Sequence, residues 1–131
     1  MKVSSKVVAF VCNWEGYLGL ESAAQKGLTL PSSVRIVRVS CLSRVQPGIM
    51  LKAFEKGAGG VILIGCSNHN CHYGSDQNTV DMSVRKVHDI MSLLGLNKDQ
   101  LGLHRMDKVD QAGLTEVLLK FNNRVQTLVN S

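Results

Sequence analysis

The sequence predicts an α/β protein built on a small doubly wound sheet, in which four parallel strands carry helices on both faces. Four short runs rich in β-branched residues alternate with segments whose apolar residues recur at helical spacing. This alternation favours a parallel sheet, because parallel strands need a crossover connection. The 131 residues contain no internal repeat or low-complexity stretch, so we expect a single domain over residues 1–131.

The four strands are expected at residues 6–12, 34–40, 60–66 and 101–106. The first and third are apolar almost throughout, which is typical of strands buried on both faces. The second carries Arg35 and Arg38 and is therefore expected nearer an edge. Right-handed crossovers then favour a flavodoxin-like (Rossmann-like) strand order of 2-1-3-4.

Two helices are expected next to the second strand in the sequence, one before it and one after it. The first is a Leu- and Ala-rich segment at residues 17–28. The second begins at Pro47, whose ring suits the first turn of a helix, and ends at Gly57.

The third and fourth helices have the clearest apolar period. We expect the third to have Asn78 or Thr79 as its N-cap and Gly95 as its terminator. Apolar residues recur at spacings of three and four in both: Val80, Val84, Val87, Met91 and Leu94 in the third, and Leu114, Val117, Leu118, Phe121, Val125 and Leu128 in the fourth.

Composition and charge exclude several classes of protein. No segment is apolar over the length needed to span a bilayer, and the short apolar run near the start lacks the features of a signal peptide, so we expect a cytoplasmic protein. The net charge of +5 would suit an acidic partner, but nucleic-acid binding is not expected because the basic residues form no stripe with aromatics. Five of them fall on the polar sides of predicted helices: Lys52, Lys56, Arg85, Lys86 and Lys120.

All four cysteines follow or end predicted strands. Cys12 ends the first strand, Cys41 follows the second, Cys66 ends the third, and Cys71 lies in the loop beyond it. In doubly wound sheets ligands bind outside the carboxyl ends of the strands. We therefore expect the four thiols to converge at this edge.

Three explanations for such a cluster are open. Buried cysteine can act as a small hydrophobe, although four at one edge fit that explanation poorly. Thiol catalysis needs a stabilised thiolate, and Cys12 precedes the first predicted helix, but its loop has no arginine to bind an oxyanion. A metal centre would employ all four thiolates, either as one tetrahedral zinc site or as the ligands of a two-iron cluster.

Cysteine spacing favours iron and sulfur over zinc without deciding the choice. The C-x2-C pairs common in zinc sites are absent, whereas the four residues between Cys66 and Cys71 match part of the plant-type ferredoxin pattern. His69 and His72 could replace two thiolates on one iron, but with four cysteines we expect all-thiolate ligation. His88 is expected on a helix surface and His104 in packing at a strand end.

Three segments together resemble a known protein family. They are "FVCNW", "VRIVRVSCLSRVQPGIMLKAFEKGAGGVILIGC" and "CHYGSDQN", and the resemblance runs from about Val7 to Met106. The sequence is similar to the delta subunit of methyl-viologen-reducing hydrogenase, an iron–sulfur protein also found in heterodisulfide reductase assemblies.

This resemblance implies one 2Fe–2S cluster held by Cys12, Cys41, Cys66 and Cys71, and no catalytic residue. It implies a hetero-oligomer in which the chain passes electrons between a partner oxidoreductase and an FAD-containing heterodisulfide reductase A-like subunit. The partner in similar assemblies is a hydrogenase, a formate dehydrogenase or a methylenetetrahydrofolate reductase. The alternative is a zinc-binding structural or interaction module without redox activity.

The chain departs from the family at one position beside the first cysteine. Members typically read Cys-Asn-Trp-Cys, whereas residues 12–15 here read Cys-Asn-Trp-Glu. Because four thiolates remain and four suffice, we expect that Glu15 is not a ligand. Trp14 has two interpretations: it covers the cluster or anchors a partner, or it is an aromatic that packs on the sheet.

Overall fold

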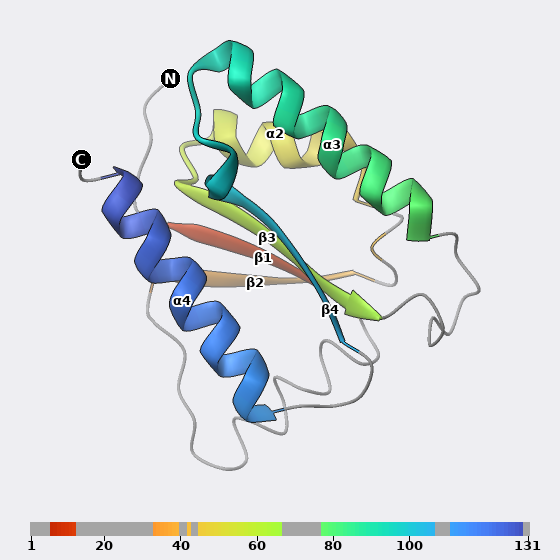
Figure 1. Cartoon of the computed structure of the whole chain (residues 1–131), viewed down its shortest axis with the longest axis vertical. Helices are drawn as coiled ribbons and strands as arrows, with labels where there is room; N and C mark the ends of the chain where they lie inside the picture. The colour runs from red at the N-terminus through yellow and green to blue at the C-terminus, as the bar shows by residue number, and fades with distance from the viewer. Residues whose placement is uncertain are drawn as a thin grey trace.

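The computed structural model describes residues 6–12, 33–39, 42, 45–66, 77–106 and 111–129. Within them lies a four-stranded sheet of order β2-β1-β3-β4, as the sequence predicted (Figure 1). Its strands are β1 (Val7–Cys12), β2 (Val34–Val39), β3 (Gly60–Cys66) and β4 (Leu101–Met106). The helix expected at 17–28 lies outside the described residues.

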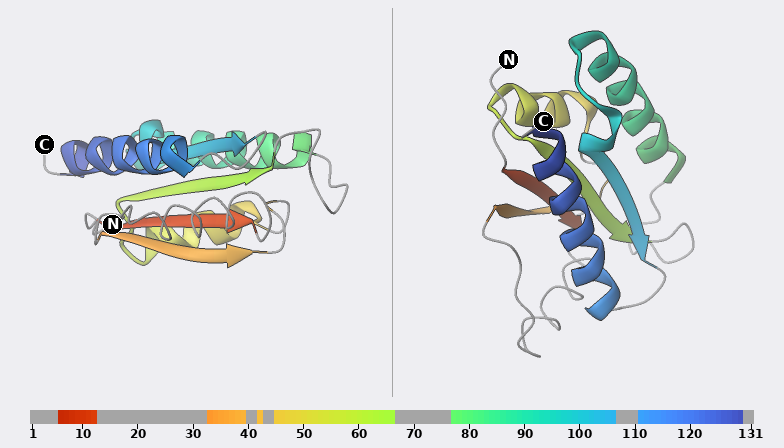
Figure 2. Two further views of the ribbon diagram at one scale, coloured as in Figure 1. Left: turned by 90° about the horizontal axis from the view of Figure 1, so that it is seen from below. Right: turned by 60° about the vertical axis from the view of Figure 1, so that its left-hand side comes forward.

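Every pair of neighbouring strands is parallel. Val7 of β1 is in register with Val34 of β2 and with Gly60 of β3, and Val61 of β3 is in register with Leu101 of β4. The carboxyl ends of the strands therefore lie at one edge of the sheet, and the arrowheads of β1, β2 and β3 point the same way in the left view of Figure 2.

Burial follows the predicted distinction between central and edge strands. Val11 in β1 and Ile64 in β3 are both 0% exposed, as expected where helices cover both faces. Strand β2 is at an edge and its Arg35 is exposed. The prediction from the two arginines is confirmed.

Helices α2 (Pro47–Glu55) and α3 (Gln77–Leu94) cover one face of the sheet. Helix α2 has Pro47 in its first turn after an extended Gln46, and its Met50 and Phe54, one turn apart, are 0% exposed. The apolar cluster between these helices and the sheet consists of Phe10, Leu42, Val45, Met50, Phe54, Val61, Leu63, Val80, Val84, Val87, Met91 and Leu101.

The predicted C-terminal end of α3 is confirmed, whereas its predicted N-cap is wrong. Gly95 has a positive φ of 79°, a conformation that suits glycine just beyond a helix. The helix begins at Gln77, so Asn78 and Thr79 lie in its first turn and the N-cap prediction is wrong by two or three residues. A short 3-10 helix, η2 (Lys98–Gln100), follows with Asn97 as its N-cap, and the sequence had not predicted it.

Helix α4 (Gln111–Val129) covers the opposite face (Figures 1 and 2). Its Leu118 and Val125 are 0% exposed. They pack with Val7, Ala9, Val11, Val34, Ile62 and Ile64, the strand residues that point to this side. The alternation along β1 and β3 thus divides the apolar side chains between two clusters, one on each face.

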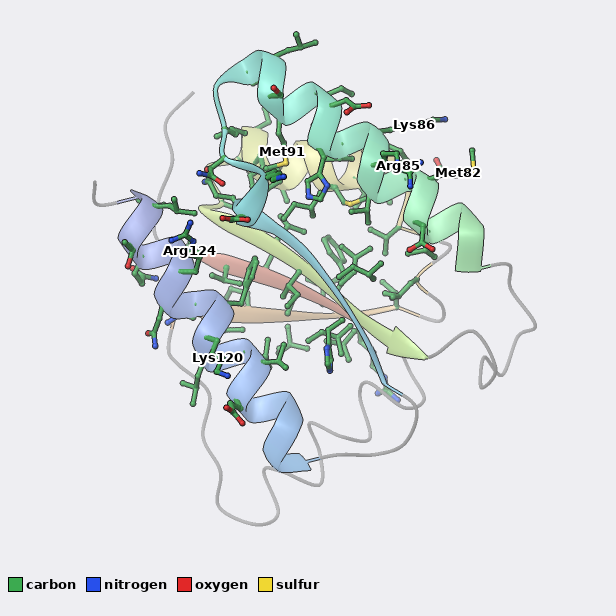
Figure 3. All side chains as sticks on the ribbon, viewed as in Figure 1. Met82, Arg85, Lys86, Met91, Lys120 and Arg124 are labelled. Atoms are coloured by element: carbon green, nitrogen blue, oxygen red, sulfur yellow. The ribbon has the colours of Figure 1, made fainter. Side chains whose placement is uncertain are left out.

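The cationic side chains lie outside this core. Arg85 and Lys86 are exposed on α3, on the side away from the sheet, whereas Met91 of the same helix points inward (Figure 3). Lys120 on α4 pairs with Glu116 at 3.0 Å. No described helix is long and apolar enough to cross a membrane.

Candidate metal centre

Two of the four predicted ligand residues occupy neighbouring strand ends. Cys12 is the last residue of β1 and Cys66 is the last residue of β3. Val11 is in register with Ile64, so the two cysteines follow that pair by one and two residues. Neighbouring strands lie roughly 4.8 Å apart, so the backbones of Cys12 and Cys66 share one edge of the sheet.

The edge strands flank these positions. Cys12 is in register with Val39 of β2, and Cys66 is in register with Met106 of β4. Cys41 and Cys71 lie outside the described residues, as do the side chains of Cys12 and Cys66. The convergence of the four sulfur atoms therefore stays a prediction, while the strand ends on which it depends lie where the sequence placed them.

Leu42 connects the end of β2 to the end of β3. Its side chain is 2% exposed and lies directly against Gly65, where a Cβ atom would come within 2.5 Å of Leu42 Cδ1. In the sheet order, β1 separates β2 from β3. Val39 thus lies beside Cys12 on one side of β1, whereas Leu42 packs against the residue that precedes Cys66 on the other side.

The contact of Leu42 with Gly65 bears on the predicted site because Cys41 is the residue that precedes Leu42 in the sequence. Consecutive Cα atoms are about 3.8 Å apart across a trans peptide bond, so Cys41 directly adjoins a residue whose side chain packs on β3. Sequence reasoning missed Leu42 and Gly65. The only available signal was a glycine immediately before a cysteine at a strand end.

The structure describes two histidines, His88 in α3 and His104 in β4, and they do not lie together at the carboxyl edge of the sheet. His88 is partly buried, and its Nε2 lies 3.1 Å from the carbonyl oxygen of Leu101, at the start of β4. The expectation of a simple surface histidine is therefore incomplete, because the ring links α3 to the sheet. His104 is partly buried within β4, in line with the packing role expected for it. His69 and His72 lie outside the described residues.

An open pocket of about 440 Å³ lies at the other edge of the sheet. It is lined by His88, Asp89, Ser92, Leu96, Asn97 and Lys98, between the end of α3 and η2. Because α3 ends where β4 begins, this pocket is at the amino edge and is separate from the cysteines. Among the described residues, no group of three or more His, Cys, Asp or Glu side chains could hold a metal ion.

The four cysteines of the sequence suit an iron–sulfur or zinc centre. They supply a set of soft thiolate ligands, the type that both groups prefer. Among the described residues, Cys12 and Cys66 end neighbouring strands, and Leu42, the residue after Cys41, packs against Gly65 on β3. Central parallel strands give Cys12 and Cys66 a rigid base.

Comparison with known proteins identifies relatives over nearly the whole chain. The chain is 38% identical over 96 residues to the iron–sulfur subunit of the F420-non-reducing hydrogenase vhc of Methanococcus voltae, covering 73% of this chain and 67% of that protein. It is 28% identical over 122 residues to the iron–sulfur subunit of the F420-non-reducing hydrogenase of Archaeoglobus profundus, covering 93% and 89%.

A longer protein contains a similar segment. The A polypeptide of the Ferredoxin:CoB-CoM heterodisulfide reductase of Methanosarcina mazei is 30% identical over 95 residues, which are 72% of this chain but 12% of that protein. The family model described as methyl-viologen-reducing hydrogenase, delta subunit, matches residues 7–129. With that match spanning every described element of the fold, the chain belongs to the family of methyl-viologen-reducing hydrogenase delta subunits.

Proposed function

We propose that this chain is a non-catalytic electron-transfer subunit of an oxidoreductase complex and that it holds one 2Fe–2S cluster. Its proposed ligands are Cys12, Cys41, Cys66 and Cys71. Relatives named as iron–sulfur subunits of hydrogenases support an iron–sulfur group of some kind. The two-iron type rests on the family resemblance, and four cysteines are consistent with it because they can give two ligands to each of two irons.

The observation that carries the proposal is the placement of Val39 and Leu42. Val39 lies beside Cys12, Leu42 packs on Gly65, the residue before Cys66, and Cys41 is one of the two residues between them in the sequence. Thiolates on three segments at one sheet edge can ligate a common group if the fourth comes from the loop after Cys66. Cys71 is five residues along that loop.

When bound, the cluster supplies a one-electron redox centre. The chain's own task is to hold the ligands still and near a surface, since movement of ligands between oxidation states slows electron transfer. Strands β1 and β3 suit that task because the side chains behind their last residues, Val11 and Ile64, are 0% exposed. No acid, base or substrate pocket is needed.

We propose that the chain docks on an FAD-containing heterodisulfide reductase A-like subunit. The A polypeptides of two heterodisulfide reductases contain a segment similar to 72% of this chain. In those proteins the similar segment is covalently linked to the rest of the A polypeptide, so each part is at high effective concentration near the other. A separate chain with the same role would bind the corresponding polypeptide as part of a hetero-oligomer.

The second partner in the proposal is an oxidoreductase that exchanges electrons with the chain. Among hydrogenase, formate dehydrogenase and methylenetetrahydrofolate reductase, the names of the iron–sulfur relatives favour hydrogenase. We place the complex in the cytoplasm, where a reducing environment keeps thiols available for metal ligation. Native pull-down with the tagged chain, followed by identification of the captured subunits and their flavin, tests both partners.

The cluster itself is tested by anaerobic purification. We expect a brown protein that contains two iron and two sulfide ions per chain, as one 2Fe–2S cluster requires, and loses visible absorption on addition of dithionite. A colourless protein with stoichiometric zinc would instead support a zinc-binding interaction module. A metal-free protein in which one cysteine alkylates selectively near neutral pH would point to thiol chemistry.

A further inference from the structure

Gly65 and Leu42 fit together in a way that excludes any side chain at position 65. A Cβ atom there would lie 2.5 Å from Leu42 Cδ1 and 2.7 Å from Leu42 Cγ, closer than Cβ atoms approach other atoms in folded proteins. The clash involves the branch point of the leucine as well as its tip. Rotation of the terminal methyl groups alone would not relieve it.

Leu42 has little room to move away. It is 2% exposed and belongs to the apolar cluster that contains Phe10, Val45 and Met50. Its carbonyl oxygen accepts a hydrogen bond from the backbone N–H of Val45 at 2.9 Å, and Val45 is itself buried. Because Leu42 is held by its packing and by this bond to Val45, a side chain at position 65 that displaced Leu42 would also displace the residue bonded to it, Cys41.

We propose that Gly65 is a positioning residue for the cysteine site and acts through Leu42. The absence of a side chain at Gly65 lets Leu42 lie on β3, and these two residues are the direct sequence neighbours of Cys66 and Cys41. The inference rests on the proposed function, since it assigns the contact a role in holding the cluster's ligands. Gly65 supplies no ligand atom itself in this role.

Gly60 provides a matched control on the same strand. A Cβ atom at Gly60 would lie 2.5 Å from Val125 Cγ2 and 3.1 Å from Phe121 Cε1, so an alanine there meets a clash with the same closest distance. Gly60 is at the opposite end of β3 and faces α4, away from the cysteines. Its alanine variant separates loss of stability from loss of ligand positioning.

The experiment compares Gly65→Ala and Gly60→Ala with the parent chain after anaerobic reconstitution with iron and sulfide. The measurements are iron per chain, the visible and electron paramagnetic resonance spectra, the rate of iron transfer to a chelator, and thermal unfolding. We expect both variants to unfold at lower temperature. Only Gly65→Ala should show altered spectra and roughly tenfold weaker retention of iron, as when groups that support metal ligands are changed.

Leu42→Ala supplies a second variant if Gly65→Ala does not fold. It removes both clashing atoms, so Leu42→Ala combined with Gly65→Ala should retain iron better than Gly65→Ala alone, a non-additive result expected for residues in contact. Equal loss of iron in Gly65→Ala and Gly60→Ala, or unchanged iron retention and spectra in Gly65→Ala and Leu42→Ala, would overturn the inference while leaving the cluster in place. A parent chain that takes up no iron and sulfide overturns the proposed function, and the inference fails with it.

Discussion

The side-chain amide of Gln100 donates a hydrogen bond to the carbonyl oxygen of Gly59 over 2.7 Å. Gln100 Oε1 also accepts from the backbone N–H of Asn97 at 2.9 Å, and the residue is 6% exposed. One buried side chain thus joins η2, before β4, to the turn before β3. It fixes the starts of two neighbouring strands whose other ends reach the cysteine edge.

Replacement of Gln100 should therefore destabilise the fold. In Gln100→Ala, the Gly59 carbonyl and the Asn97 N–H both lose a buried partner, so we expect the free energy of unfolding to fall by roughly 1–3 kcal/mol. Urea denaturation followed by circular dichroism measures the change. Lys98→Ala, in the same short helix but at an exposed position, should change it by less than about 0.5 kcal/mol. Similar losses in the two variants would contradict the role of the buried amide.

Two adjacent leucines on α4 test the packing of that helix on the sheet. Leu118 is 0% exposed and packs in the cluster with Ile62 and Ile64, whereas Leu119 is 40% exposed. Leu118→Ala should lower the free energy of unfolding by roughly 2–5 kcal/mol, because it leaves a cavity in a close-packed core. Leu119→Ala should lower it by less than about 1 kcal/mol. Equal losses of stability in the two variants would mean that α4 does not face the sheet with the side that carries Leu118.

Alanine substitution at two glycines near helix ends should change the stability of the protein in opposite directions. Gly95 has a φ of 79° after α3, and a Cβ there would meet nothing within 4 Å, so the cost of Gly95→Ala comes from the backbone alone, roughly 1–2 kcal/mol. Gly48, in the first turn of α2, also has open space around it. Gly48→Ala should stabilise the protein by up to about 1 kcal/mol by restricting the unfolded chain. Thermal unfolding of both variants measures the two signs, and stabilisation by Gly95→Ala would contradict the assigned helix end.

The sheet could be predicted from the sequence because burial on both faces leaves a strong pattern. The runs "VVAFVC" and "GVILIGC" are apolar without alternation, and they occupy the centre of the sheet. Arg35 marked the edge strand because a charged residue is tolerated only where one side meets water. The start of α3 was missed by two or three residues because Asn78 and Thr79 are favourable N-cap residues in isolation.

The candidate site was predictable only as far as its strand ends. Parallel topology places Cys12 and Cys66 at one edge whatever the loops do. The contact of Leu42 with Gly65 depends instead on the path of the chain from β2 to α2. No local pattern encodes that path, because it is set by packing between residues 23 positions apart in the sequence. Gln100 was missed for the same reason, since its partner Gly59 is distant in sequence.

Glu15 marks the position at which this chain departs from its family. The family resemblance implies a second cysteine at this position after Cys12, and four thiolates already complete the proposed ligand set. Glu15→Ala should therefore retain iron and sulfide at the level of the parent chain. Alanine at Cys12, Cys41, Cys66 or Cys71 removes a direct ligand, so the loss of iron affinity should exceed the roughly 10- to 100-fold typical of supporting residues. Iron and sulfide analysis after anaerobic reconstitution makes the comparison. Loss of iron in Glu15→Ala, together with full retention in any one cysteine variant, would assign a carboxylate oxygen to the site in place of that thiolate.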